Sequence, residues 1–178
     1  MVGVTTTKGV REEMFLQESL FDYEPDKEEQ DKLSRLRALA KQGPRQCECC
    51  GGTVCVYKRK LNSGMAAVLC WLVANRMGEW THVRQIPAYI DQGHHEIGRL
   101  AYWQLVERQE NADTNKRSSG IWRPTRDGAS FVLRNMAVPS HAFCGVPGHT
   151  ILGFEEETIT IHEALGDKFN YQELIRGE

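Results

Sequence analysis

The stretch Ala101–Val132, AYWQLVERQENADTNKRSSGIWRPTRDGASFV, decides the fold. It opens as the end of a helix and continues with two short segments, Leu105–Glu110 and Gly120–Pro124, which read as strands. The nine residues between these segments, NADTNKRSS, are polar and place a Lys beside an Arg. Thr125 is a suitable N-cap for a helix that begins at Arg126. The predicted order is therefore helix, strand, basic loop, strand and helix.

Further elements are predicted directly upstream of this stretch. Residues 62–76, NSGMAAVLCWLVANR, combine helix formers with apolar side chains at helical spacing, and Asn62 or Ser63 can cap the helix. Gly93 separates two later helical segments, so that they form a helix-turn-helix. In chain order, the predicted elements are the helix Asn62–Arg76, the strand Trp80–Val83, the helix Ile86–Gln92 and the helix His94–Val106.

The last of these helices has two different faces. Its apolar residues recur on one side with a period of 3.6: Ile97, Leu100, Ala101 and Leu105. The opposite side carries His95, Arg99 and Tyr102. A recognition helix has this division, because one side packs into the core while the other enters the major groove of DNA. Together with the two strands, this pattern predicts an α+β protein built around a winged helix-turn-helix.

Positive charge is concentrated in the middle of the chain. Residues 57–136 carry 12 Lys and Arg against 7 Asp and Glu, a net charge of +5, whereas residues 137–178 carry 2 against 7, a net charge of −5. A phosphate-binding surface needs such a basic region. Lys116 and Arg117 at the loop tip are candidate backbone contacts. The run Lys58, Arg59 and Lys60 is either a phosphate clamp or a solvated basic segment.

Two cysteine-containing motifs flank the central region. Cys47 and Cys50 belong to a C-x-x-C-G motif, and His141 and Cys144 to an H-x-x-C-G motif of the same shape. A structural zinc ion takes four such ligands, so these four residues predict one structural Zn²⁺ per chain. Cys49, Cys55 or His149 could replace one of the four ligands, or all of these residues could be free thiols and turn histidines. Cys70 falls on the apolar face of a helix and is predicted to be a core residue.

The flanking segments complete a three-part division of the chain into residues 1–46, 47–136 and 137–178. Residues 26–42 predict an amphipathic helix, whose leucine face packs either on the chain's own core or on a second copy in a homodimer. The last part is predicted to form a hairpin followed by a strand and a helix. The hairpin strands are Val138–Phe143 and His149–Phe154, the single strand is Thr158–Ile161, and the helix is Glu163–Ile175.

Two resemblances accompany this reading. The sequence L-V-E-R, the loop with Lys-Arg, and W-R-P-T-R-D-G resemble the wing and the T-x-x-G helix start of MarR-like winged-helix regulators over residues 61–135. The stretches CECCG, YKRKLNSGMA and IHEALGDKFNYQEL resemble small zinc-knuckle winged-helix proteins of tailed bacteriophages over most of residues 47–175. These resemblances imply a winged-helix fold, a zinc knuckle and a phage setting.

The expected function is non-catalytic binding of double-stranded DNA, in transcriptional or replication control. The alternative is a phage module that binds and modulates a host protein, such as a polymerase or a defence factor. No phosphate loop and no G-x-S-x-G motif occurs in the sequence, so an enzyme is not expected. The first ten residues have no apolar region typical of a signal peptide, and no run reaches transmembrane length, so a cytoplasmic protein without membrane contact is expected.

Overall fold

The structure, a computed structural model, describes residues 27–91, 96–111, 119–148 and 150–176. The helices are α1 (Lys27–Gln42), α2 (Ser63–Arg76), α3 (Ala88–Asp91), α4 (Ile97–Leu100), α5 (Arg126–Val132), α6 (Ile161–Leu165) and α7 (Tyr171–Arg176). The 3₁₀ turns are η1 (Val83–Gln85), η2 (Ala101–Trp103) and η3 (Gly166–Lys168). The strands are β1 (Arg45–Gln46), β2 (Thr53–Lys60), β3 (Thr81–His82), β4 (Val106–Arg108), β5 (Ile121–Pro124), β6 (Val138–Pro139), β7 (His141–Val146), β8 (Thr150–Phe154) and β9 (Thr158–Ile159).

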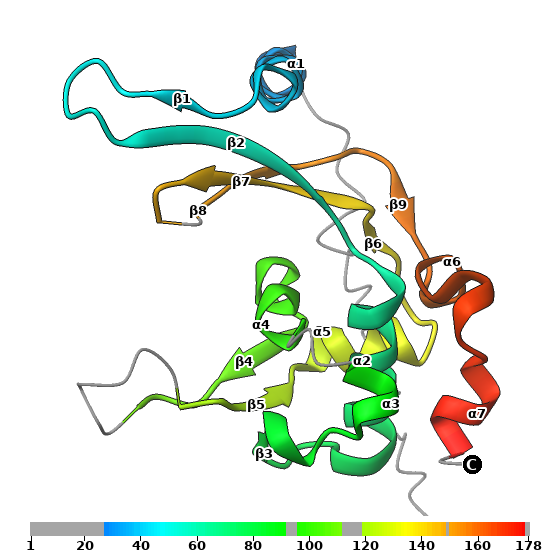
Figure 1. Cartoon of the computed structure of the whole chain (residues 1–178). Coiled ribbons are helices and arrows are strands. Elements are labelled where there is room, and N and C mark those ends of the chain that lie inside the picture. Colours follow the sequence, from blue (N-terminus) through cyan, green and yellow to red (C-terminus); the bar gives the residue numbers. More distant parts are fainter. Residues whose placement is uncertain (1–26, 92–95, 112–118, 149, 177–178) are drawn as a thin grey trace, which may run out of the picture.

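The protein is an α+β structure with two main sheets. One is a four-stranded sheet in the order β1-β2-β7-β8, and the other is a three-stranded sheet in the order β3-β5-β4. In Figure 1, α1 covers one face of the larger sheet, and the helices from α2 to α5 lie on the other side together with the smaller sheet. The strands β6 and β9 form a separate antiparallel pair.

Helix α2 is the centre of the core. The Asn62 side chain accepts a hydrogen bond of 2.9 Å from the Met65 N–H and so caps the helix, which decides between the two predicted caps, Asn62 and Ser63. Residues Met65 to Leu72 are buried except for the partly exposed Trp71. A helix that is apolar on most sides must be surrounded by other elements. Contacts with α3, α4, α5, α6 and α7 provide this cover.

The strand pairing predicted around the basic loop is confirmed. β4 and β5 are antiparallel, with Val106 opposite Pro124 and Arg108 opposite Trp122. β3 pairs with the other edge of β5. The Thr125 hydroxyl accepts a hydrogen bond of 3.0 Å from the Gly128 N–H and caps α5, again as predicted.

The helix predicted for His94–Val106 is shorter than expected. Residues 92–95 lie outside the described residues, and the described part, α4 with η2, ends at Trp103. Gln104 has a left-handed backbone with φ of +56°, and the Leu105 N–H donates to the Leu100 carbonyl over 3.2 Å. The chain turns here because a left-handed residue ends an α-helix. The preceding helix is also shorter, since it begins at Ala88 and not at Ile86.

Strand β2 was not predicted as a strand, and it connects the parts of the molecule. It pairs with β1 on one edge and with β7 on the other. The predicted hairpin near the C-terminus is present as β7 and β8, but its first strand begins at His141, because Val138 and Pro139 form β6 and pair with β9. The four-stranded sheet therefore contains strands from all three predicted parts of the chain.

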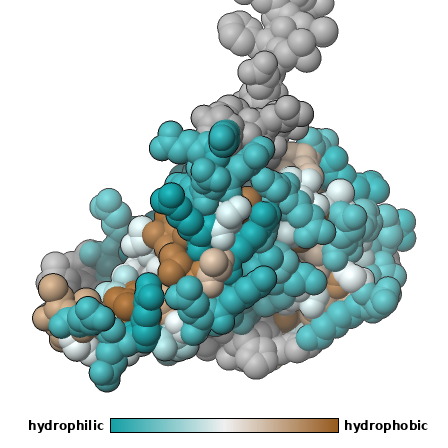
Figure 2. All heavy atoms as spheres, turned by 90° about the horizontal axis from the view of Figure 1, so that it is seen from above, coloured by the Kyte–Doolittle hydropathy of each residue, from teal (hydrophilic) through white to brown (hydrophobic). Residues whose placement is uncertain are grey.

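Helix α1 packs on this sheet with its leucine face. Leu33 and Leu36 are buried against Phe143 of β7, with Val56 and Leu152 at the edge of the cluster. Most of the predicted leucine stripe is therefore covered within the same chain. Figure 2 views the molecule from above and shows a largely hydrophilic face with a small hydrophobic patch on its left side. A shallow groove of about 220 Å³ beside α1 is lined by Leu39, Val54, Val146 and neighbouring residues.

The C-terminal segment contains two short helices, α6 and α7, where the single helix Glu163–Ile175 was predicted. Gly166, with φ of +57°, ends α6, and α7 begins five residues later at Tyr171. Thr160 and Glu163 form a capping box at the start of α6. The Tyr171 hydroxyl donates to the Val132 carbonyl over 3.0 Å and holds α7 against α5. None of the described helices is long and apolar enough to cross a membrane.

Candidate functional site

Helix α4 carries the first group of predicted DNA-binding residues. Figure 1 shows α4 between the β4–β5 hairpin and the larger sheet. Ile97 and Leu100 are buried, whereas the Arg99 side chain keeps 45% of its surface exposed. The division between an apolar and a polar side is thus present in the described part of the helix. His95 lies outside the described residues, as do Lys116 and Arg117.

Arg99 is held by an acidic neighbour on its own helix. Its Nη1 lies 2.7 and 2.8 Å from the two carboxylate oxygens of Glu96. Glu96 also accepts a weaker hydrogen bond of 3.5 Å from the Asn62 side-chain amide. Arg99 is 45% exposed and Glu96 only 14% exposed, so the pair is partly screened by solvent on the arginine side.

Tyr102 is half-buried and lies near two of the predicted arginines. Its ring is 6.3 Å from the ring of Trp103, measured between centroids. Burial raises the pKa of the Tyr102 hydroxyl, while the positive charges of Arg59 and Arg99 act against this rise. These three predicted residues are therefore within electrostatic range of one another, although they come from β2 and from the α4–η2 segment.

The predicted phosphate clamp Lys58–Lys60 is not a single surface. Neighbouring residues in a strand point to opposite faces of the sheet. Lys58 lies on the α1 side, where its Nζ is 6.0 Å from the Phe143 ring centroid and 2.6 Å from a Glu155 oxygen. The Arg59 guanidinium instead stacks over Tyr57 at 4.7 Å. Arg59 is on the side of Tyr102 and Lys58 is not, so the structure does not place Lys58 and Arg59 on one surface.

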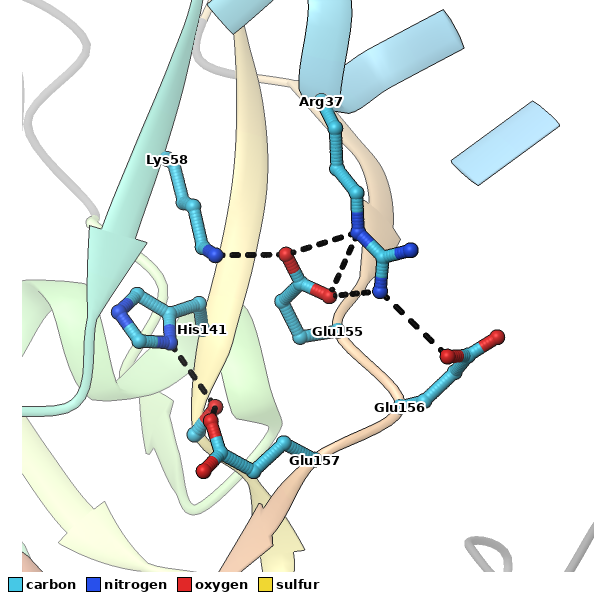
Figure 3. A network of polar contacts seen from close by, with 7 residues as sticks. Arg37, Lys58, His141, Glu155, Glu156 and Glu157 are labelled. Carbon is cyan, nitrogen blue, oxygen red and sulfur yellow. Dashed lines mark hydrogen bonds and ion pairs between the residues drawn. The ribbon is translucent and has the colours of Figure 1, made fainter. Parts of the chain in front are cut away.

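Glu155 forms a polar junction between α1 and the sheet (Figure 3). Its buried carboxylate accepts hydrogen bonds from Arg37 at 2.5 to 3.2 Å and pairs with Lys58. Hydrogen bonding to Arg37 is the main reason why the pKa of Glu155 falls to about 2. Glu156 lies at the edge of the junction, 3.4 Å from the same guanidinium. This junction joins α1 to the sheet.

The four predicted zinc ligands are not brought together. Cys47 and Cys50 lie in the turn between β1 and β2, whereas Cys144 and His141 are opposite Tyr57 and Lys60, several residues along β2. His141 and Cys144 are also three apart in one strand, so their side chains point to opposite faces. Cys144 is in the main core, and His141 lies within 2.8 Å of the Ser140 hydroxyl. The structure therefore does not place the four predicted ligands in one site.

Burial and Lys58 lower the pKa of the His141 imidazole. The Ser140 hydroxyl also donates a hydrogen bond of 3.2 Å to the Glu157 carboxylate. Cys70 is fully buried, and its surroundings raise the pKa of its thiol to about 12. Its predicted role as a core residue is confirmed. Among the residues that the structure describes, no group of three or more His, Cys, Asp or Glu side chains is arranged to hold a metal ion.

The Cys47–Gly52 turn nevertheless has a defined geometry. The Gly51 N–H donates to the Cys47 carbonyl and the Cys47 N–H donates to the Gly52 carbonyl, both over 2.8 Å. Gly51 has a φ of +68°, which favours glycine. The backbone N–H groups of Cys50 and Cys49 donate to the Cys47 sulfur and lower the pKa of that thiol. The turn has the shape of a knuckle that presents two sulfurs.

One basic residue of the β4–β5 hairpin was missed at the sequence level. The Arg123 guanidinium lies 4.3 Å from the Trp80 ring centroid and 2.5 Å from a Glu107 oxygen. Trp80 remains 38% exposed, which is high for a large apolar residue. The sequence analysis predicts Trp80–Val83 as a strand but does not pair it with Gly120–Pro124, and it is this pairing, β3 with β5, that brings the cation to the aromatic ring.

Comparison of the chain with protein-family models, with curated proteins and with solved structures found no match.

Proposed function

We propose that residues 62–132 form a winged helix-turn-helix that binds double-stranded DNA without catalysis. The observation that carries this proposal is the order α2, β3, α3, α4, β4, β5 combined with the strand order β3-β5-β4. A winged helix has this order, with a recognition helix before the last two strands and a wing between them. In this proposal, α4 with η2 is the recognition helix, and the segment joining β4 to β5 is the wing.

The proposed contacts follow from the chemistry of the side chains. Arg99 is exposed on α4 and can contact a guanine edge or a phosphate, and the half-buried Tyr102 offers its hydroxyl nearby. Arg59 lies on the same side of the larger sheet as Tyr102 and adds positive charge. Lys116 and Arg117 of the wing are proposed to hold the adjacent phosphate backbone. Such a protein would act in transcriptional or replication control in a phage.

Removing the proposed contacts should weaken DNA binding. We expect the triple variant Arg99→Ala, Lys116→Ala, Arg117→Ala to bind a random duplex at least ~10-fold more weakly at low salt. A plot of log K against the logarithm of the salt concentration has a negative slope. This slope should become shallower by about 2 to 3 in the variant, because each lost phosphate contact removes about 0.9 from its magnitude. A gel-shift titration at two salt concentrations measures both quantities.

Arg76→Ala provides a matched control for this experiment. Arg76 also pairs with a glutamate three positions away, Glu79, at 3.3 Å, and its exposure of 42% is close to that of Arg99. We expect its binding and salt slope to equal those of the unmodified protein. If the triple variant binds DNA as tightly as the unmodified protein, the surface formed by α4 and the wing does not bind DNA. If the unmodified protein shows no salt-sensitive binding, the proposed function is excluded.

A protein partner is the second candidate, and the ion pairs favour it. Arg99 and Arg123, both close to the proposed DNA-binding surface, are already paired with Glu96 and Glu107. Pairing within the chain reduces the positive potential that DNA would meet. A host polymerase or defence factor would then be the target. A nuclease-treated pull-down from host lysate distinguishes this candidate, because binding through DNA is lost on nuclease treatment.

A further inference from the structure

The turn between β1 and β2 presents two cysteines at the outer end of a hairpin. Cys50 is exposed and Cys47 is partly exposed. Figure 1 shows this turn projecting beyond the other strands of the sheet, away from α2. Another molecule can therefore approach both sulfurs without displacing any part of the core.

The turn is already shaped to hold a soft metal ion. The two backbone hydrogen bonds between Cys47 and residues 51–52 close the turn, and the Cys50 thiol hydrogen-bonds to the Cys47 sulfur, so the two sulfurs are neighbours. A Cβ at Gly52 would lie 3.4 Å from the Cys50 Sγ, so the glycine keeps the space beside that sulfur open. Thiolates paired in this way bind Zn²⁺, which takes sulfur ligands at about 2.3 Å.

The described residues supply half of a tetrahedral site at this turn. Within the described ranges no third His, Cys, Asp or Glu joins Cys47 and Cys50 in a group able to hold a metal. His141 and Cys144 are further along the sheet, on opposite faces. Residues 1–26 contain no Cys and no His. A structural zinc ion needs four ligands, so two more must come from elsewhere.

We propose that the Cys47–Cys50 turn is half of a zinc site shared by two copies of this chain. Each copy contributes two thiolates, so the ion has four sulfur ligands and the pair has twofold symmetry. A second copy offers the same two ligands in the same geometry, and a twofold contact closes on itself. On binding, each chain releases two thiol protons to solvent, four per zinc ion. This proposal is independent of DNA binding.

Metal content and molecular mass, measured on one sample, test the shared site. The full chain is purified with a non-thiol reductant, which excludes a disulfide between copies. We expect 0.5 zinc per chain, because two copies share one ion, and a dimer mass in sedimentation. Removing the metal with a chelator should give monomers, and titration of these with Co²⁺ should saturate at 0.5 equivalents with the absorption of tetrahedral thiolate coordination.

Two double variants distinguish the proposed zinc ligands from the neighbouring cysteines. Cys47→Ser with Cys50→Ser should lose both the zinc and the dimer, while its circular dichroism stays unchanged because the turn is at the surface. Cys49→Ser with Cys55→Ser keeps both properties if the assignment is right. One zinc per monomer, no zinc at all, or a dimer that survives chelation would each overturn the proposal. If the protein holds one zinc per monomer, loss of that zinc in His149→Ala would identify His149 as a ligand from the same chain.

Discussion

Replacing Gly128 by alanine is expected to destabilise the protein by about 3 kcal/mol or more, a large effect for the addition of one methyl group. A Cβ at this position would lie 2.0 Å from the Leu105 carbonyl oxygen and 3.0 Å from its carbon. That carbonyl belongs to the backbone and accepts a hydrogen bond of 3.1 Å from the Thr125 N–H, so it cannot move without disturbing the cap of α5. Chemical denaturation measures the change in the free energy of unfolding.

Gly98→Ala is the matched control, since this glycine is also in a helix. A Cβ there would meet the Trp122 ring at 3.6 Å, an ordinary van der Waals contact. Alanine is better than glycine in a helix by about 0.5–1 kcal/mol, so this variant should be as stable as the unmodified protein or slightly more stable. If both variants unfold at the same denaturant concentration, α5 does not approach Leu105 as closely as described.

The second large effect is expected at Glu155. In Glu155→Gln the charge is removed, while most of the volume of the side chain is kept. The difference between a pKa of about 2 in the folded protein and the ordinary value of 4.5 sets the upper limit of the loss. Because Arg37 and Lys58 are each 41% exposed, solvent screens the interaction, and we expect a loss of about 2 kcal/mol at neutral pH.

The loss should depend on pH in a defined direction. A carboxyl group whose pKa is lowered by folding stabilises the folded protein above its unfolded pKa, and this stabilisation disappears as the pH falls toward the folded pKa. The gap between the unmodified protein and Glu155→Gln should thus be constant above about pH 5 and narrow between pH 4.5 and 2.

Glu156→Gln is the control for the same measurement. Glu156 touches the same arginine but is 46% exposed, so we expect a change below about 0.5 kcal/mol at any pH. An equal effect of the two substitutions would mean that Glu155 is not the centre of the junction. Thermal or denaturant unfolding at several pH values gives the comparison.

Local signals in the sequence predicted much of the central segment correctly. The Asn62 cap, the Thr125 cap and the pairing of β4 with β5 each depend on a few adjacent residues whose chemistry is specific. The end of the helical segment formed by α4 and η2 could not be predicted in this way. Gln104 adopts a left-handed backbone although glutamine has no special preference for it, and only its tertiary surroundings explain this choice.

The candidate residues that the structure separates lie on strands, where neighbouring side chains point to opposite faces, and the first of these strands is β2. Its residues alternate between a face toward α1, with Val56 and Lys58, and a face with Tyr57 and Arg59. The sequence analysis treats Lys58–Lys60 as one basic run and predicts no strand there, so it does not include this alternation. The H-x-x-C-G motif was misinterpreted for the same reason, because its similarity to a knuckle holds for a turn but not for a strand such as β7.

The short link between β2 and α2 has a mechanical consequence. Leu61 is fully buried and its N–H donates to the Ser140 carbonyl over 3.0 Å, and the next residue, Asn62, already caps the helix. The eight residues of β2 span about 26 Å and join the core without a flexible hinge. The strand is therefore a stiff arm. A partner bound at the outer end of β2 is therefore held at a fixed distance and orientation from α2. If two copies of the chain are joined through this end, the distance between their two α2 helices is fixed as well.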